Sequence, residues 1–197
     1  GIDKFDRESQ RFHSMALGDS SSAEVRDMTE DSEGTLWVGT TQGLFYKTAD
    51  SDTFVLESLG SIDQRSEITS LLVDRLGGLW IGTFNHGLMY QQKAGGGLRY
   101  LENQTGDIKS LSHNSVRDIV QLRDDSIWVG TDRGLNILTH PSDSHFLRFS
   151  HEKLVEQSLS SDVVSALYQD TSGLVWLGTW TAGINKVDLA TIQFDTI

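Results

Sequence analysis

Two short polar segments hold aromatic side chains beside hydrogen-bonding groups, a combination typical of ligand-recognition surfaces. One contains Phe84, Asn85 and His86, and the other contains Trp180 and Thr181. An aromatic face can stack on the apolar face of a ligand while neighbouring polar groups bond its edge. We therefore take these five residues as candidate ligand-binding residues. Two alternatives stay open: each aromatic packs on its own sheet, and His86 is an ordinary loop histidine.

No residue pattern predicts catalysis, a metal site or a bound cofactor. The paired acidic residues Glu30-Asp31 and Asp124-Asp125 fall in predicted turns, where solvated carboxylates are common. The histidines show no ligand-like pairing, and the sequence lacks a nucleophile elbow, a phosphate-binding loop and an EF-hand calcium loop. We expect no catalytic residue, no metal ligand and no cofactor. A carbohydrate-active enzyme is kept as a less favoured alternative.

The composition narrows the range of partners. The formal net charge is −12, from 28 acidic and 16 basic side chains, which disfavours the phosphate backbone of a nucleic acid as a partner. No apolar run approaches the roughly 20 residues that a membrane span needs, so we expect no membrane insertion by this segment. Cysteine is absent, which excludes disulfides and thiolate metal sites.

The elements that would position the candidate residues repeat along the chain. A strand-like segment with one tryptophan, followed by Gly-Thr and then by Gly-Leu or Gly-Ile, occurs four times. Self-similarity with a period of about 40 to 50 residues indicates a stacked-repeat architecture. An aromatic that recurs at one place in every repeat is expected to pack one repeat against the next. We therefore assign four residues to the core: Trp37, Trp80, Trp128 and Trp176.

A second strand is predicted twelve residues before each of these tryptophans. These strands begin at Val25, Ile68, Val116 and Val164, and a turn with at least one Asp links each of them to its tryptophan strand. Such turns favour β-hairpins. Two more strands follow in each unit, and four antiparallel strands repeated radially describe the blades of a β-propeller. A helical solenoid is disfavoured because no stretch of ten or more residues holds a 3.6-residue period.

The predicted fold is therefore all-β: a β-propeller segment with four complete four-stranded blades plus a half-blade, within a single domain over residues 1–197. The half-blade covers 1–21, and the blades cover about 22–60, 61–109, 110–157 and 158–197. We expect a fragment of a larger propeller or an open arc that self-associates, because an uncovered blade face would expose apolar side chains.

This architecture adds four candidate binding residues. Arg26 and Arg117 occupy the second position of the first strand, which lines the central channel of a propeller, and could face a ligand there. Ion pairs with the neighbouring Asp27 and Asp118 are an equally weighted alternative. The segment Asp132-Arg133 lies between Gly-Thr and Gly-Leu in the third unit, on the same rim as the aromatic segments.

The repeats resemble the two-component regulator propeller repeat. The string Ser110–Ile119, continuing into Trp128–Asn136, carries the resemblance, and Ser158–Val164 with Gly173–Thr179 is equally close. The resemblance covers nearly the whole chain. It implies the periplasmic sensor region of a bacterial membrane receptor, whose output domain is a histidine kinase, a hybrid two-component protein or a diguanylate cyclase. Ligands of such sensors are often oligosaccharides.

The residues and the resemblance together predict a non-enzymatic, ligand-sensing periplasmic segment of a two-component-type receptor. The expected partners are an oligosaccharide or another small molecule on the rim or in the channel, and either a further copy of the chain or the remaining blades at its open ends. A protein–protein interaction scaffold is the main alternative. The identity of the ligand and of the output domain stays open.

Overall fold

The computed structural model describes residues 1–18, 23–93, 97–155, 157–189 and 193–196. Within these ranges all regular elements are β-strands, grouped into one two-stranded sheet and four four-stranded sheets. The same ranges contain no helix with the length and apolar character needed to cross a bilayer.

The strands follow one another in chain order within each sheet. The two-stranded sheet pairs β1 (Ile2–Asp6) with β2 (Arg11–Met15). The first blade comprises β3 (Val25–Glu30), β4 (Leu36–Thr40), β5 (Gly43–Lys47) and β6 (Val55–Leu56). The second comprises β7 (Ile68–Val73), β8 (Leu79–Thr83), β9 (Leu88–Gln91) and β10 (Leu98–Leu101).

The third and fourth blades repeat this antiparallel meander. The third comprises β11 (Val116–Gln121), β12 (Ile127–Thr131), β13 (Gly134–Leu138) and β14 (Leu147–Phe149). The fourth comprises β15 (Val164–Gln169), β16 (Val175–Thr179), β17 (Ile184–Asp188) and β18 (Gln193–Thr196).

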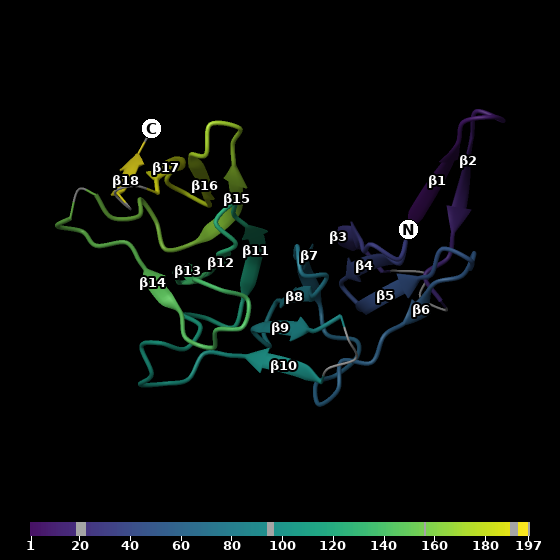
Figure 1. Ribbon diagram of the computed structural model, residues 1–197, viewed down its shortest axis with the longest axis horizontal. Coiled ribbons are helices and arrows are strands. Elements are labelled where there is room, and N and C mark those ends of the chain that lie inside the picture. Colours follow the sequence, from purple (N-terminus) through teal and green to yellow (C-terminus); the bar gives the residue numbers. More distant parts are fainter. Residues whose placement is uncertain (19–22, 94–96, 156, 190–192, 197) are drawn as a thin grey trace.

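The blades are arranged as an open arc, with the β1–β2 hairpin at one end and the fourth blade at the other (Figure 1). The prediction of four complete blades and two further strands in an all-β fold is confirmed. The predicted boundary between half-blade and first blade, at residues 21 and 22, lies outside the described residues. Self-association of the arc stays a prediction.

Two rims of the arc are distinguished below. The connection rim carries the turns between the second and third strands of each blade and the links from one blade to the next. The hairpin rim, on the opposite side, carries the turns between the first and second strands and between the third and fourth strands. This assignment follows from the antiparallel order of the strands.

The apolar core lies in layers between successive sheets. The layer between the second and third blades, for example, packs Trp80 and Leu88 against Val116, Ile127 and Leu138, all of which are buried. Similar layers join the first blade to the second and the third blade to the fourth. Each blade therefore depends on its neighbour to bury one face.

The glycine two residues after the tryptophan allows this close packing in the first three blades. A Cβ at Gly82 would lie 2.7 Å from Val116 Cγ1, and one at Gly39 would lie 2.7 Å from Ile68 Cγ2. Both contacts are to the first strand of the next blade. In these blades the glycine is thus required because the first strand of the next blade passes directly over it.

Polar bonds hold successive blades in register on the hairpin rim. Arg75 Nη1 donates to the Leu122 carbonyl at 2.7 Å, and Arg123 Nη1 donates to the Thr171 carbonyl at 3.0 Å. The two arginines occupy the same turn position in the second and third blades. The blade-to-blade angle is therefore fixed by hydrogen bonds as well as by apolar packing.

Candidate functional site

A β-bulge interrupts the first strand of every blade at its second residue. The pairing with the second strand skips one residue between Val25 and Asp27, and it does so at the same position in the other three blades. A bulge bends the strand and re-aims the side chain of the extra residue. The four bulged residues are Arg26, Thr69, Arg117 and Ser165.

All four bulged residues line one open hollow on the concave side of the connection rim. Its volume is about 430 Å³. The three other lining residues come from the adjoining loops: Glu67, Phe84 and Trp180. The hollow thus collects side chains from all four blades, and its size lies within the range of small-molecule sites in proteins.

Arg117 lies at the centre of this hollow. Its Nε and Nη2 donate to the two carboxylate oxygens of Asp132 at 2.6 and 3.0 Å. The guanidinium carbon lies 5.8 Å from the ring centroid of Phe84 and 5.1 Å from that of Trp180, within cation–π range. A side chain of the third blade is therefore held between aromatics of the second and fourth blades.

The Asp132 carboxylate is held in its charged form. Burial opposes its ionisation, but the hydrogen bonds and positive charge of Arg117 outweigh this effect and keep the pKa of Asp132 below its usual value. The ion pair fixes the guanidinium plane between the two rings. Phe84 and Trp180 remain 47% and 64% exposed, so both rings still present apolar surface to a ligand.

Arg26, from the first blade, also lines the hollow and forms its own ion pair. Its Nε donates to Glu67 at 3.0 Å, and its Nη1 lies 3.6 Å from Glu24. The hydroxyls of Thr69 and Ser165 donate to backbone carbonyls at 2.8 and 3.1 Å, so they shape the wall more than they reach outward.

The alternative prediction, that Arg26 and Arg117 form ion pairs with Asp27 and Asp118, is wrong. Asp27 and Asp118 do not pair with them and instead accept the backbone N–H of Leu71 and Leu167 in the adjacent blades, at 2.7 and 2.6 Å. Burial, and secondarily the negative charge of Asp27, raises the pKa of Asp118. These carboxylates therefore serve packing between blades.

The remaining sequence-predicted site residues lie outside the lining of the hollow. Asn85 and Thr181 are exposed on the same loops as the aromatics. The backbone N–H groups of His86 and Arg133 bond the threonine hydroxyl that closes each turn, at 2.8 and 3.1 Å. The structure thus brings Arg26, Phe84, Arg117, Asp132 and Trp180 together and leaves these four at the periphery.

Two groups of residues escaped the sequence reasoning. Glu67, Thr69 and Ser165 join the hollow, and the equivalence of Thr69 and Ser165 to the arginines was the signal that could have included them. The first turn of three blades also holds an aspartate that accepts the indole N–H of its own tryptophan. These bonds measure 3.1 Å from Trp37 to Asp31, 2.9 Å from Trp80 to Asp74 and 2.8 Å from Trp176 to Asp170.

For Asp31 this finding corrects the expectation that the paired carboxylates of the turns are simply solvated. Asp74 is buried, and the pKa of Asp31 is lowered because hydrogen bonds to its carboxylate outweigh the effect of burial. In the third blade Ser126 takes over the bond to the indole of Trp128, at 3.1 Å.

The four repeat tryptophans differ in burial. Trp80 and Trp128 are 0% and 2% exposed, whereas Trp37 and Trp176 are only half-buried. The described residues contain no group of three or more His, Cys, Asp or Glu side chains that could hold a metal ion.

Known structures share this fold. The BT3049 chain, described as the extracellular domain of a hybrid two component system from B. thetaiotaomicron, superimposes with a TM-score of 0.73 at 22% identity, covering 88% of this chain and 24% of that one. Streptogramin B lyase superimposes with a TM-score of 0.72 at 12% identity, covering 99% of this chain and 60% of that one. The chain thus spans less than two thirds of either structure, and identities this low show the fold alone. A search of curated proteins found no match.

The repeats themselves match a family model. The model described as the two component regulator propeller matches residues 19–42, 64–85, 110–133 and 158–181. Each match runs through the first two strands of a blade, including its bulge, its tryptophan and its Gly-Thr pair. The chain is therefore a tandem array of two component regulator propeller repeats and belongs to that family.

Proposed function

We propose that the chain is a ligand-sensing, extracytoplasmic propeller segment of a bacterial signalling receptor, and that the hollow on the connection rim binds the ligand. The observation that carries this proposal is the position of Arg117 between two half-exposed aromatic rings from neighbouring blades. The membership of the repeat family and the likeness to the BT3049 extracellular domain support the sensing role and a periplasmic location.

The charges of the hollow favour a neutral, hydroxyl-rich ligand. Arg26 faces Glu67, with Glu24 3.6 Å away, and Arg117 faces Asp132, so nearby carboxylates balance both positive charges. Ion pairs of this kind can donate and accept hydrogen bonds from hydroxyl groups, while the rings of Phe84 and Trp180 stack on apolar ring faces. A neutral oligosaccharide matches this combination best.

Titration calorimetry with a panel of neutral oligosaccharides tests the proposal. Binding should be lost or weakened at least about tenfold in Trp180→Ala, because stacking on an aromatic contributes on the order of 1 kcal/mol or more. His86→Ala is the matched control, since His86 is a loop residue of the same rim outside the lining. Equal weakening in both variants would contradict the assignment of the site.

Product analysis in the same incubations tests the enzymatic alternative. Chromatography of the oligosaccharides should show no turnover. Cleavage of any sugar would replace the sensor proposal by a carbohydrate-active enzyme. Absence of binding across the panel would favour a protein–protein interaction scaffold.

A further inference from the structure

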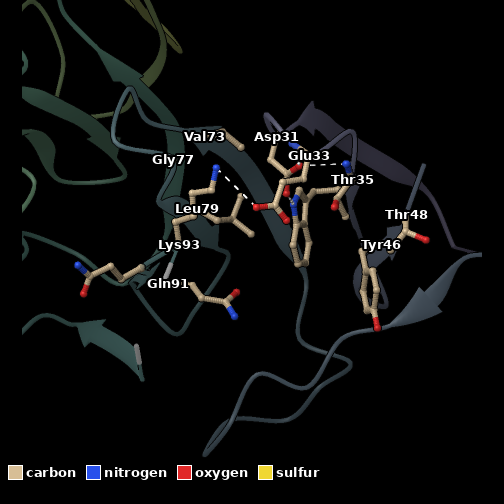
Figure 2. Close-up of a pocket in the computed structure, with 12 residues that line it drawn as sticks. Asp31, Glu33, Thr35, Tyr46, Thr48, Val73, Gly77, Leu79, Gln91 and Lys93 are labelled. Atoms are coloured by element: carbon tan, nitrogen blue, oxygen red, sulfur yellow. Dashed lines mark hydrogen bonds and ion pairs between the residues drawn. The ribbon is translucent and has the colours of Figure 1, made fainter. Parts of the chain in front are cut away.

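A second cleft lies between the first and second blades and opens on the hairpin rim, on the side opposite the hollow described above. Its volume is about 240 Å³. Figure 2 shows Tyr46 and Thr48 of the first blade on one side and Leu79, Gln91 and Lys93 of the second blade on the other. The carboxylates of Asp31 and Glu33 lie at its rim, and the half-buried Trp37 forms part of its wall.

The same aromatic pair occurs in the next blade, where it is occupied. The ring centroids of Trp37 and Tyr46 are 5.4 Å apart, and those of Trp80 and Tyr90 are 4.4 Å apart, with an interplanar angle of 38° in both pairs. In the second blade the Arg99 guanidinium lies 5.7 Å from the Trp80 centroid and 5.0 Å from the Tyr90 centroid. This chain therefore already uses the pair as a cation–π platform.

In the first blade the position of that arginine is held by Val55. Val55 is the strand partner of Tyr46, as Arg99 is the strand partner of Tyr90. Val55 brings no charge to the rings. Lys93, the nearby cation, instead donates to Ser32 at 2.7 Å and pairs with Glu33 at 3.6 Å. Among the described residues, no cation of the chain stacks on Trp37 or Tyr46.

The second blade also leaves room beside this platform. In the third blade Leu138 is the strand partner of Ile127. At the equivalent position of the second blade the strand partner of Leu79 is Gln91. Leu138 is fully buried, and Trp80 beneath that interface is 0% exposed. The polar Gln91 does not close the layer in the same way, and Trp37 stays half-buried.

We propose that this cleft binds a guanidinium-bearing ligand, such as the arginine side chain of a peptide, in the place that Arg99 occupies in the second blade. The guanidinium stacks on Trp37 and Tyr46, and Asp31 and Glu33 supply two negative charges against the single positive charge of Lys93. A guanidinium fits better than an ammonium because its plane can stack on a ring while its edge bonds a carboxylate. The net charge of −12 attracts such a cation.

The test follows the indole N–H signals in the nuclear magnetic resonance spectrum of protein labelled with ¹⁵N at tryptophan. The five tryptophans give five signals, and Trp37→Phe identifies that of Trp37. Titration with Nα-acetyl-arginine amide should shift the Trp37 signal saturably. The citrulline analogue has nearly the same shape without the charge, and it should bind at least about tenfold more weakly if cation–π attraction drives binding.

Three substitutions at exposed positions sharpen the result. Val55→Arg gives the first blade its own guanidinium and should abolish binding of the probe. Leu147→Arg adds the same charge at the equivalent strand position of the third blade, where exposure is similar (52% against 48% for Val55), and should leave binding unchanged. Glu33→Gln should weaken binding about threefold through loss of one charge near the surface.

The outcomes separate cleanly. A saturable Trp37 shift that requires the positive charge and is lost in Val55→Arg supports the site. The proposal is overturned by an unmoved Trp37 signal at millimolar probe, by equal binding of the citrulline analogue, or by full binding in a folded Val55→Arg protein. None of these outcomes depends on ligand binding at the connection rim.

Discussion

Adding one methyl group at Gly82 should destabilise the packing between the second and third blades. The Cβ of Gly82→Ala would lie 2.7 Å from Val116 Cγ1, well inside van der Waals contact, and 3.2 Å from Ile119 Cδ1. Val116 is fully buried in the first strand of the third blade, so the clash falls inside the apolar layer between the two blades. Overpacking of this kind costs about 1 to 3 kcal/mol of unfolding free energy.

The same motif in the fourth blade supplies the control. A Cβ at Gly178 would meet the Ala166 Cβ at 3.3 Å, and the three atoms nearest to it, at 3.3 to 3.9 Å, all belong to β15 of its own blade. Gly178→Ala should therefore be close to neutral, since a tight contact is offset by the roughly 0.4 to 1 kcal/mol gained when alanine replaces glycine in the unfolded chain.

Thermal and urea unfolding of the two variants measure the difference. For a protein of this length, Gly82→Ala should lower the melting temperature by about 2 to 4 °C for each kcal/mol lost. If Gly82→Ala has the same melting temperature as Gly178→Ala and the parent protein, the close approach of neighbouring blades is not the reason for glycine in this motif.

Three further predictions concern the core, the rim and the buried carboxylates. Trp128→Ala should cost about 3 to 5 kcal/mol in urea unfolding, because it removes a large buried side chain; a melt like that of the parent would show that the indole does not support the core. Trp180→Ala should change stability by less than about 1 kcal/mol, and unfolding of this variant would place Trp180 in the core instead of the site. Asp118 has a pKa raised by burial, so the folded state binds more protons than the unfolded state as pH falls below neutrality, and the stability of the parent relative to Asp118→Asn should rise as the pH is lowered toward 4. A pH-independent difference in unfolding free energy would contradict this reasoning.

Much of the fold is predictable from the sequence because the repeat is dense in local signals. The first strand of each blade begins where the sequence predicts it, at Val25, Ile68, Val116 and Val164. The signals are alternating apolar residues, turn aspartates and glycines. Each acts over a few residues, so the hairpins of each blade can be predicted from its own sequence. The period then fixes how the blades follow one another.

The hollow on the connection rim is less predictable because its contacts join different blades. Arg117 and Phe84 were identified separately, yet their approach depends on the angle between the second and third blades. The bulge that turns Arg117 toward the hollow leaves no composition signal in a single strand. The pairing of Arg117 with Asp132 likewise depends on the register shift that this bulge introduces.

The shared bulge separates the residues that line the hollow from the residues that form the apolar layers between blades. The residue before the bulge is buried apolar packing in three blades, at Ile68, Val116 and Val164, whereas the bulged residue belongs to no apolar layer. One position per blade can thus change its chemistry without altering the apolar layers between blades. The bulged positions of the four blades hold Arg, Thr, Arg and Ser. Substitution at any one of them would change the lining of the hollow while the fold stays the same.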